Sequence, residues 1–275
     1  MNNNNNILLI DPAFDPASSS ACNLLVKVGT DHLSYAIINK ETKQVYVVFD
    51  QQECEDGTLK LAERLKTDPY LALAYQEVKT AVHTDNVVSI PNEVYSETSL
   101  NTHAKFLTGV NHGNLYTQSL SHFGFTTIFA LPKATDQILN THLTNTKRYQ
   151  HNAGLFALAE KVAGTALFLD FSVGSLHTLY LKDQQVIFQQ CYEIANIEEF
   201  NYYLLLMINQ LHIDPKQTDI HLAGIIHDGD EKYNCLLKYF TSIQFINITN
   251  EPAQEILDEM PLHYYSSLLA LDLCV

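Results

Sequence analysis

The polar residues best placed for chemistry follow two apolar runs. Lys27 comes directly after residues 24–26, and Asp170 comes directly after residues 167–169. A carboxylate at a strand end that faces a cleft could hold Mg²⁺ or act in catalysis, and a lysine could contact an anionic ligand as a point charge. The simpler alternatives are an aspartate that accepts hydrogen bonds from its own turn and a lysine with a solvated head. Both pairs of alternatives stay open at this point.

The chain contains twelve histidines and five cysteines, which are potential metal ligands or nucleophiles. His221 and His227 form the best local pair, but residues six apart on an extended strand are separated by about 20 Å, too far for one ion. The sequence His227-Asp228-Gly229-Asp230 is typical of a loop. No two cysteines have a CxxC spacing, and no serine lies in a GxSxG turn. We therefore expect no catalytic residues and no metal site. Five further histidines show no helix-face spacing of three or four: His103, His112, His122, His142 and His151.

Two segments of the chain share one pattern. LLVKVGTDHLSYAIINKETKQVYVVF (24–49) aligns with LFLDFSVGSLHTLYLKDQQVIF (167–188) when Lys27 is placed on Asp170. Apolar and polar residues alternate within both segments, which is typical of half-buried strands. Each segment is therefore expected to form three antiparallel strands joined by tight turns. A repeat of this size predicts two similar lobes.

The segments after the first repeat favour alternating helices and strands. Helical patterning is interrupted at Asp68-Pro69, because proline disfavours helix in the residue before it. A long helix is expected to connect the two lobes. The expected elements are a helical region at 59–82, a strand at 86–90, a helix from Pro91 to 107, strands at 115–119 and 126–131, and the connecting helix at 135–162.

The second lobe is expected to follow the same plan. Helix 197–211 is apolar on nearly all sides and should be the most buried helix. The remaining elements are a strand at 219–226, a helix at 232–240, a strand at 243–248 and a final helix at 263–273. The fold class is α/β with mixed sheets. We expect a disordered or irregular leader at 1–20, a first lobe at 21–162 with its connecting helix, and a second lobe at 163–275.

Charge and composition exclude several partners. The net charge of −15 repels phosphate backbones and anionic membranes, so nucleic acid is not expected to bind. The chain has no apolar run of about 18 residues, and its first residues lack the basic and apolar pattern of a signal peptide. We expect a cytoplasmic protein without membrane insertion whose partner is another protein.

With two lobes of this plan, the chain resembles the actin, sugar kinase and Hsp70 ATPase superfamily, which is built from tandem ribonuclease-H-like lobes. More narrowly, it resembles an uncharacterised bacterial family, domain of unknown function 3822, which is similar to actin-like pilus-assembly proteins. The resemblance covers about residues 22–273. It depends on the segments KVGTDHLSYAIIN, LFLDFSVGSLHTLYL and DIHLAGII.

The resemblance implies a nucleotide site built from three elements. Catalytic members carry Asp-x-Gly-Thr after the first strand, where the Asp manages Mg²⁺ and backbone amides cradle phosphate. Here the first turn keeps Gly29 and Thr30, but Lys27 replaces the acid. The second turn keeps Asp170, with Ser172 at the glycine position and Gly174 two residues later. The adenosine element is matched by Gly224, with Ala223 in place of another glycine.

These departures favour a non-catalytic actin-like protein that binds another protein or serves as a scaffold without a cofactor. The alternative is a divergent Mg-ATP-dependent ATPase or phosphotransferase that uses Gly29, Thr30, Asp170, Gly174 and Gly224. An acidic residue near Lys27, Asp31 or Asp50, would favour that alternative. A small-molecule sensor is a third hypothesis.

Overall fold

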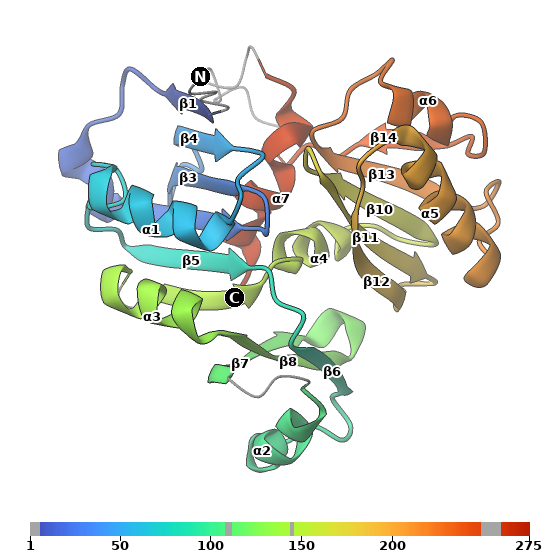
Figure 1. Ribbon diagram of the computed structural model, residues 1–275, viewed down its shortest axis with the longest axis horizontal. Coiled ribbons are helices and arrows are strands. Elements are labelled where there is room, and N and C mark those ends of the chain that lie inside the picture. The colour runs from blue at the N-terminus through green and yellow to red at the C-terminus, as the bar shows by residue number, and fades with distance from the viewer. Residues whose placement is uncertain (1–5, 108–111, 144–145, 249–259) are drawn as a thin grey trace. The chain divides into compact units, whose positions relative to one another are not determined.

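The computed structural model describes residues 6–107, 112–143, 146–248 and 260–275. The chain forms two compact units, Met1–Ala153 and Gly154–Val275. Each unit contains its own mixed β-sheet (Figure 1).

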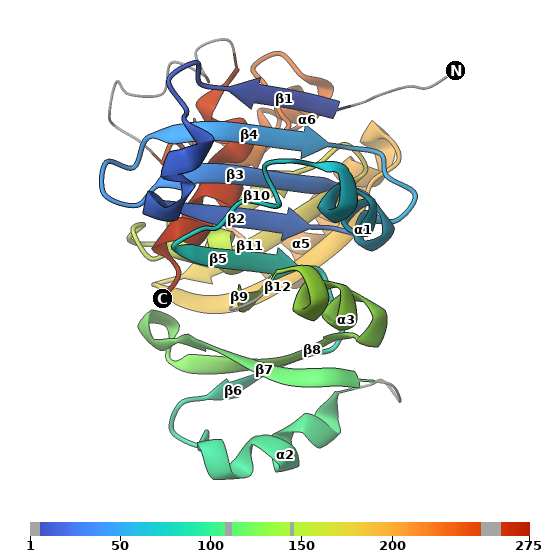
Figure 2. The same ribbon diagram turned by 90° about the vertical axis from the view of Figure 1, so that its left-hand side faces the viewer.

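The first unit is built on a six-stranded sheet with the order β1-β4-β3-β2-β5-β9 (Figure 2). Strands β2, β3 and β4 form an antiparallel meander, and β5 and β9 extend the sheet parallel to β2. Every residue of β2 is buried, as expected for a mostly apolar central strand that is covered on both faces. The strands are β1 (Asn6–Ile10), β2 (Cys22–Val28), β3 (Leu33–Asn39), β4 (Val45–Gln51), β5 (Glu77–Val82) and β9 (Thr146–Gln150).

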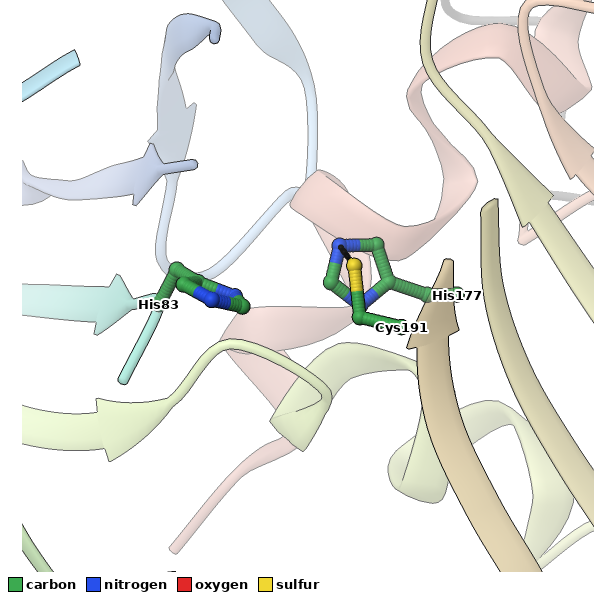
Figure 3. Close-up of side chains that lie close together, drawn as sticks. All are labelled: His83, His177 and Cys191. Atoms are coloured by element: carbon green, nitrogen blue, oxygen red, sulfur yellow. Dashed lines mark hydrogen bonds between the residues drawn. The ribbon is translucent and has the colours of Figure 1, made fainter. Parts of the chain in front are cut away.

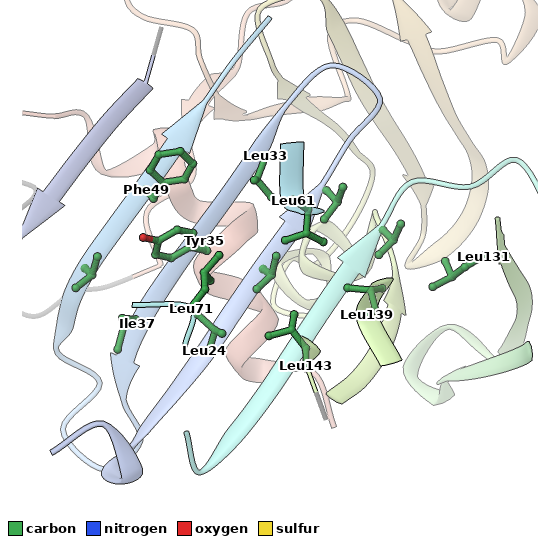
Figure 4. Packing of buried hydrophobic residues seen from close by; sticks show 14 of the residues in the cluster. Leu24, Leu33, Tyr35, Ile37, Phe49, Leu61, Leu71, Leu131, Leu139 and Leu143 are labelled. Carbon is green, nitrogen blue, oxygen red and sulfur yellow. The ribbon is translucent and has the colours of Figure 1, made fainter. Parts of the chain in front are cut away.

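The main core of the first unit lies between this sheet and helices α1 (Gly57–Thr67) and α3 (Lys133–His142) (Figure 4). Alternate residues of β2 point into it, because residues two apart on a strand share a face. Leu61 of α1 and Leu139 of α3 are fully buried against them. Asp56 begins α1 by accepting hydrogen bonds from the backbone N–H groups of Thr58 and Leu59.

A second, smaller sheet is inserted between β5 and β9. It is antiparallel, with the order β6-β8-β7. Its elements are β6 (Val87–Pro91), β7 (His112–Leu120), β8 (Phe125–Pro132) and the short helix α2 (Leu100–His103). Ile90, Leu107, Ile128 and Ala130 form its own buried cluster. The expected strands at 86–90, 115–119 and 126–131 are confirmed.

The second unit has a five-stranded sheet with the order β12-β11-β10-β13-β14. This order matches β4-β3-β2-β5-β9, and the parallel and antiparallel pairings match as well. The fold class predicted from the repeat is confirmed. The strands are β10 (Ala166–Phe171), β11 (Ser175–Lys182), β12 (Gln185–Glu193), β13 (Asp219–Gly224) and β14 (Ile243–Phe245).

Helix α5 packs its buried stripe against this sheet. Phe200, Leu204 and Met207 are buried, whereas Tyr202 is 60% exposed. The prediction that this is the most buried helix was therefore wrong, because only one stripe meets the core, whereas every residue of the helix Ser266–Leu269 is buried. The helices of the unit are α4 (Ala153–Ala159), which begins at the boundary, α5 (Ile197–Gln210), α6 (Glu231–Leu236) and α7 (Ser266–Leu269).

Three further expectations need correction. Residues 6–10 of the expected irregular leader form β1, because an apolar β-prone segment can pair with the edge of β4; residues 2–5 lie outside the described residues. The helical pattern ends at Thr67, and the second half of 59–82 contains β5. The single helix expected at 135–162 is α3, β9 and α4.

Two helices expected elsewhere are broken into short pieces. Pro91 ends β6 and does not begin a long helix, and residues 97–106 form consecutive short turns. The final helix expected at 263–273 is α7 between two 3₁₀ segments. Helix 197–211 is confirmed closely by α5.

Candidate functional site

The two sheets place chemically active residues in equivalent rows. In the first unit, Lys27 of β2 pairs with Ser34 of β3, which pairs with Asp50 of β4. Directly opposed residues on neighbouring strands share a face, so these three side chains lie in one row. Lys27 is only 7% exposed, and the alternative of a solvated surface lysine does not hold.

Asp50 is the acidic residue that the alternative hypothesis required near Lys27. Burial raises the pKa of the Asp50 carboxyl, while a hydrogen bond from Gln52 and the nearby His32 and Lys27 lower it in part. The net direction is upward, so the carboxyl is a weaker acid than an exposed aspartate.

The turn after β2 is filled by its own residues. The ring of His32 lies against Gly29, so closely that a Cβ atom there would stand 2.1 Å from the ring. The Gly29 N–H donates to the carbonyl of His32 at 2.9 Å, and the Thr30 carbonyl accepts from the N–H of Gly57 at 3.0 Å. Gly29 is needed here to make room for an imidazole. Its amide is already used within the turn.

The equivalent row of the second unit is Asp170, His177 and Cys191. Asp170 of β10 pairs with His177 of β11, which pairs with Cys191 of β12. The Sγ atom of Cys191 lies 3.5 Å from Nε2 of His177 (Figure 3); His83, also drawn there, belongs to the first unit. An acid, an imidazole and a thiol thus follow one another across the sheet, and the imidazole can accept the thiol proton.

The turn after β10 is closed by two serines. Ser172 and Ser175 are joined by a 2.5 Å hydrogen bond between their hydroxyls, and the Ser172 N–H donates to the Ser175 carbonyl at 3.0 Å. The carbonyl of Gly174 accepts from the N–H of Ile194 at 2.8 Å. Gly174 therefore anchors the turn to the end of β12.

Asp170 and Gly224 are brought together by the parallel pairing of β10 with β13. Gly224 has φ +76°, and a Cβ atom on it would lie 2.0 Å from the Phe171 carbonyl and 2.8 Å from Oδ1 of Asp170. The position therefore requires glycine. Asp170 is buried at 4% exposure.

The five residues named from the sequence thus fall into two groups. Gly29 and Thr30 share the first turn, and Asp170, Gly174 and Gly224 lie around the corresponding turn of the second unit. Sequence reasoning missed the partners that complete the rows: Ser34, Asp50, His177 and Cys191. The strand alternation and the repeat alignment contained the signal, because His177 aligns with Ser34 when Asp170 is placed on Lys27.

Two similar mixed sheets of this order, with turns at equivalent strand ends, define a protein of the actin-like ATPase fold. A solved structure from Bacteroides thetaiotaomicron, described as having that fold and unknown function, is 19% identical with a TM-score of 0.74, covering 95% of this chain and 99% of that one. The sequence model of the family described as "Protein of unknown function (DUF3822)" matches residues 11–243. The chain belongs to that family.

Two further structures share the fold. A PilM–PilN type IV pilus biogenesis complex contains a chain 13% identical, with a TM-score of 0.55 and coverage of 91% of this chain and 97% of that one. The ethanolamine utilization protein EutJ from Carboxydothermus hydrogenoformans is 9% identical, with a TM-score of 0.51 and coverage of 97% and 93%. A search of curated proteins finds no match. Within the described residues, none of the helices has both the length and the apolar character needed to cross a bilayer.

Proposed function

We propose that this protein is a non-catalytic actin-like module that binds another protein without needing a nucleotide. The main support for this proposal is the turn after β2. There Lys27 occupies the position of the Mg²⁺-organising acid, and the His32 ring fills the space beside Gly29. A phosphate would have to displace that ring and compete for an amide that already has an acceptor. The solved PilM–PilN complex supports this direction, since its fold relative is found with a protein partner.

A groove in the second unit is where we place the partner. It has a volume of about 390 Å³ between β12 and α5, and it is lined by Phe188, Tyr192, Leu206, Met207, Gln210 and Leu211. Pockets of this size and apolar character suit a bulky side chain. β12 is the outer strand of its sheet, so an extended segment could pair with its backbone.

The partner expected there is a basic protein segment that carries one large apolar side chain. The net charge of −15 favours a cationic partner and predicts that binding weakens as salt increases. The apolar anchor would supply most of the affinity, as buried anchors do at protein interfaces.

The test is capture by the full chain, followed by reconstitution from two purified proteins. Leu206→Lys puts a charge into the groove and should weaken binding at least tenfold. Tyr202→Lys is the matched control, because Tyr202 lies on the same helix, is 60% exposed and does not line the groove. Equal binding by the two variants, or a partner whose binding does not depend on salt, would contradict the proposal.

Two observations favour the second candidate, a divergent ATPase. Asp50 lies in the same row as Lys27. Asp170 and Gly224 lie together as a carboxylate and a close backbone approach would in a nucleotide site. Phosphate release from Mg-ATP separates the candidates. The proposed function expects none, whereas turnover by the wild-type chain that Asp170→Asn abolishes would establish the ATPase.

A further inference from the structure

Three histidines of the first unit gather at one edge of its sheet. β2, β5 and β9 are parallel neighbours, so their carboxyl ends meet at the same edge. His83 directly follows β5, His151 directly follows β9, and His32 closes the turn after β2. The backbones of His83 and His151 continue the hydrogen bonding of this sheet. The His83 N–H donates to the Val28 carbonyl at 2.8 Å, and the His151 N–H donates to the Val82 carbonyl at 3.1 Å.

The closest pair has the spacing of two ligands on one ion. Nε2 of His32 lies 3.2 Å from Nε2 of His151, and the ring centroids are 5.2 Å apart. Two imidazoles bound tetrahedrally at about 2.0–2.1 Å would have their nitrogens roughly 3.3 Å apart. The ring centroid of His83 is 6.2 Å from that of His151, and Nε2 of His83 lies 3.5 Å from Oδ1 of Asp85, so the His83 ring would have to turn toward the pair to act as a third ligand.

Asp31 fixes the tautomer and the orientation of the His32 ring. Its Oδ1 lies 2.8 Å from Nδ1 of His32, so the Nδ1–H donates to the carboxylate and the Nε2 lone pair faces His151. A carboxylate behind a ligating imidazole is a frequent arrangement at metal sites, where it sets the tautomer and makes the ligand more basic.

The closest pair is shielded from solvent. His32 and His151 are 4% and 2% exposed. Without an ion, the 3.2 Å contact is a hydrogen bond in which one imidazole donates to the other. The distance fits both states, and an ion would replace one shared proton.

We propose that His32 and His151 form a binding site for a divalent transition metal of the zinc class, with His83 as third ligand and Asp31 as the residue that orients His32. A water or a ligand from solution would complete a tetrahedral set. This site is independent of the proposed partner groove, which lies in the other unit.

Calorimetric titration of the chelator-treated full chain with Zn²⁺ tests the site. We expect one equivalent to bind, with affinity at least about 100-fold lower in His32→Gln and in His151→Gln. Asp31→Asn keeps all three imidazoles and should weaken binding by about 10- to 100-fold. His122→Gln is the matched control, because His122 is exposed and lies on the inserted segment of the same unit; it should bind as the wild type does.

A second measurement needs no variant and covers the case in which a substitution prevents folding. Co²⁺ bound to imidazoles alone should give a visible spectrum without the strong thiolate charge-transfer absorption in the ultraviolet. Cys191→Ser reports separately on the His177–Cys191 pair of the second unit. Undiminished Zn²⁺ affinity in both His32→Gln and His151→Gln, loss of binding only in Cys191→Ser, a thiolate band with Co²⁺, or no binding at all would each overturn the proposal.

Discussion

The surroundings of Gly224 allow only glycine at this position. Its φ of +76° and the 2.0 Å approach to the Phe171 carbonyl leave no room for a side chain. Gly224→Ala should therefore lose roughly 2–4 kcal/mol in the free energy of unfolding, from backbone strain and overpacking together. Urea denaturation measures this.

Gly229→Ala provides the comparison for that prediction. Gly229 also has a positive φ, +87°, but nothing lies within 4 Å of its missing Cβ. Only the conformational strain applies, and the expected loss is roughly 1–2 kcal/mol. Equal losses for the two variants would mean that the close approach at Gly224 does not exist in solution.

Some of the candidate site residues could be predicted from the sequence and others could not. Asp170 and Gly224 could be assigned to one site in advance, because the resemblance to the actin-like superfamily places both in its nucleotide elements. His32, His83 and His151 could not, since ligand searches by spacing look three or four residues away and these residues are 51 and 68 positions apart. Their meeting depends on β5 and β9, two strands that the helical patterns concealed.

At the level of elements, helix α1 bounds the turn after β2, because the N–H of Gly57 donates to the Thr30 carbonyl. Its N-cap, Asp56, accepts from two backbone amides at 2.7 and 3.1 Å. Asp56→Ala should cost about 1 kcal/mol of stability. Asp56→Ser keeps a capping oxygen and should stay near the wild type. A cost as large in the serine variant as in the alanine variant, again by urea denaturation, would contradict this role.

Strand β5 explains why the elements were only partly predictable. Glu77–Val82 carries two charged residues, and a helical pattern precedes it, yet four of its six residues are buried. The Lys79 and Glu77 side chains approach within 3.5 Å. This segment is a strand because it pairs in parallel with β2, which lies about fifty residues earlier in the sequence. Local patterns do not contain such information.

For the whole molecule, buried histidines should make stability depend on pH. Burial lowers the folded-state pKa of His221, and it does the same for His263 despite the opposing hydrogen bond to the Ile226 carbonyl. An unfolded histidine titrates near about 6.5, so below that pH the unfolded chain binds more protons than the folded one. Stability is therefore full above pH 6.5 and falls as pH decreases toward the folded-state values.

Thermal unfolding between pH 7.5 and 5.5 tests this pH dependence. The melting temperature should fall with acidification, because the free energy of unfolding decreases by at most about 1.4 kcal/mol per pH unit for each group. His263→Gln keeps a donor for the Ile226 carbonyl and should reduce the slope. A flat profile, or an unchanged slope in the variant, would show that these rings are not held neutral by burial.

The two units repeat one plan, but their rows differ in chemistry. Lys27, Ser34 and Asp50 in the first correspond to Asp170, His177 and Cys191 in the second. The repeat made the fold predictable, because apolar alternation is retained in both copies. It could not specify activity, because the polar positions have diverged.

A thermal-shift titration of the full chain with Mg-ATP and Mg-ADP tests the central claim most directly. A ligand at a hundredfold excess over its Kd adds about 2.7 kcal/mol to stability, which is roughly 5 °C or more for a chain of this size. Because His32 fills the first turn and Lys27 replaces its acid, we predict no shift at millimolar nucleotide. A saturable, Mg²⁺-dependent rise that disappears in Asp170→Ala would contradict the account.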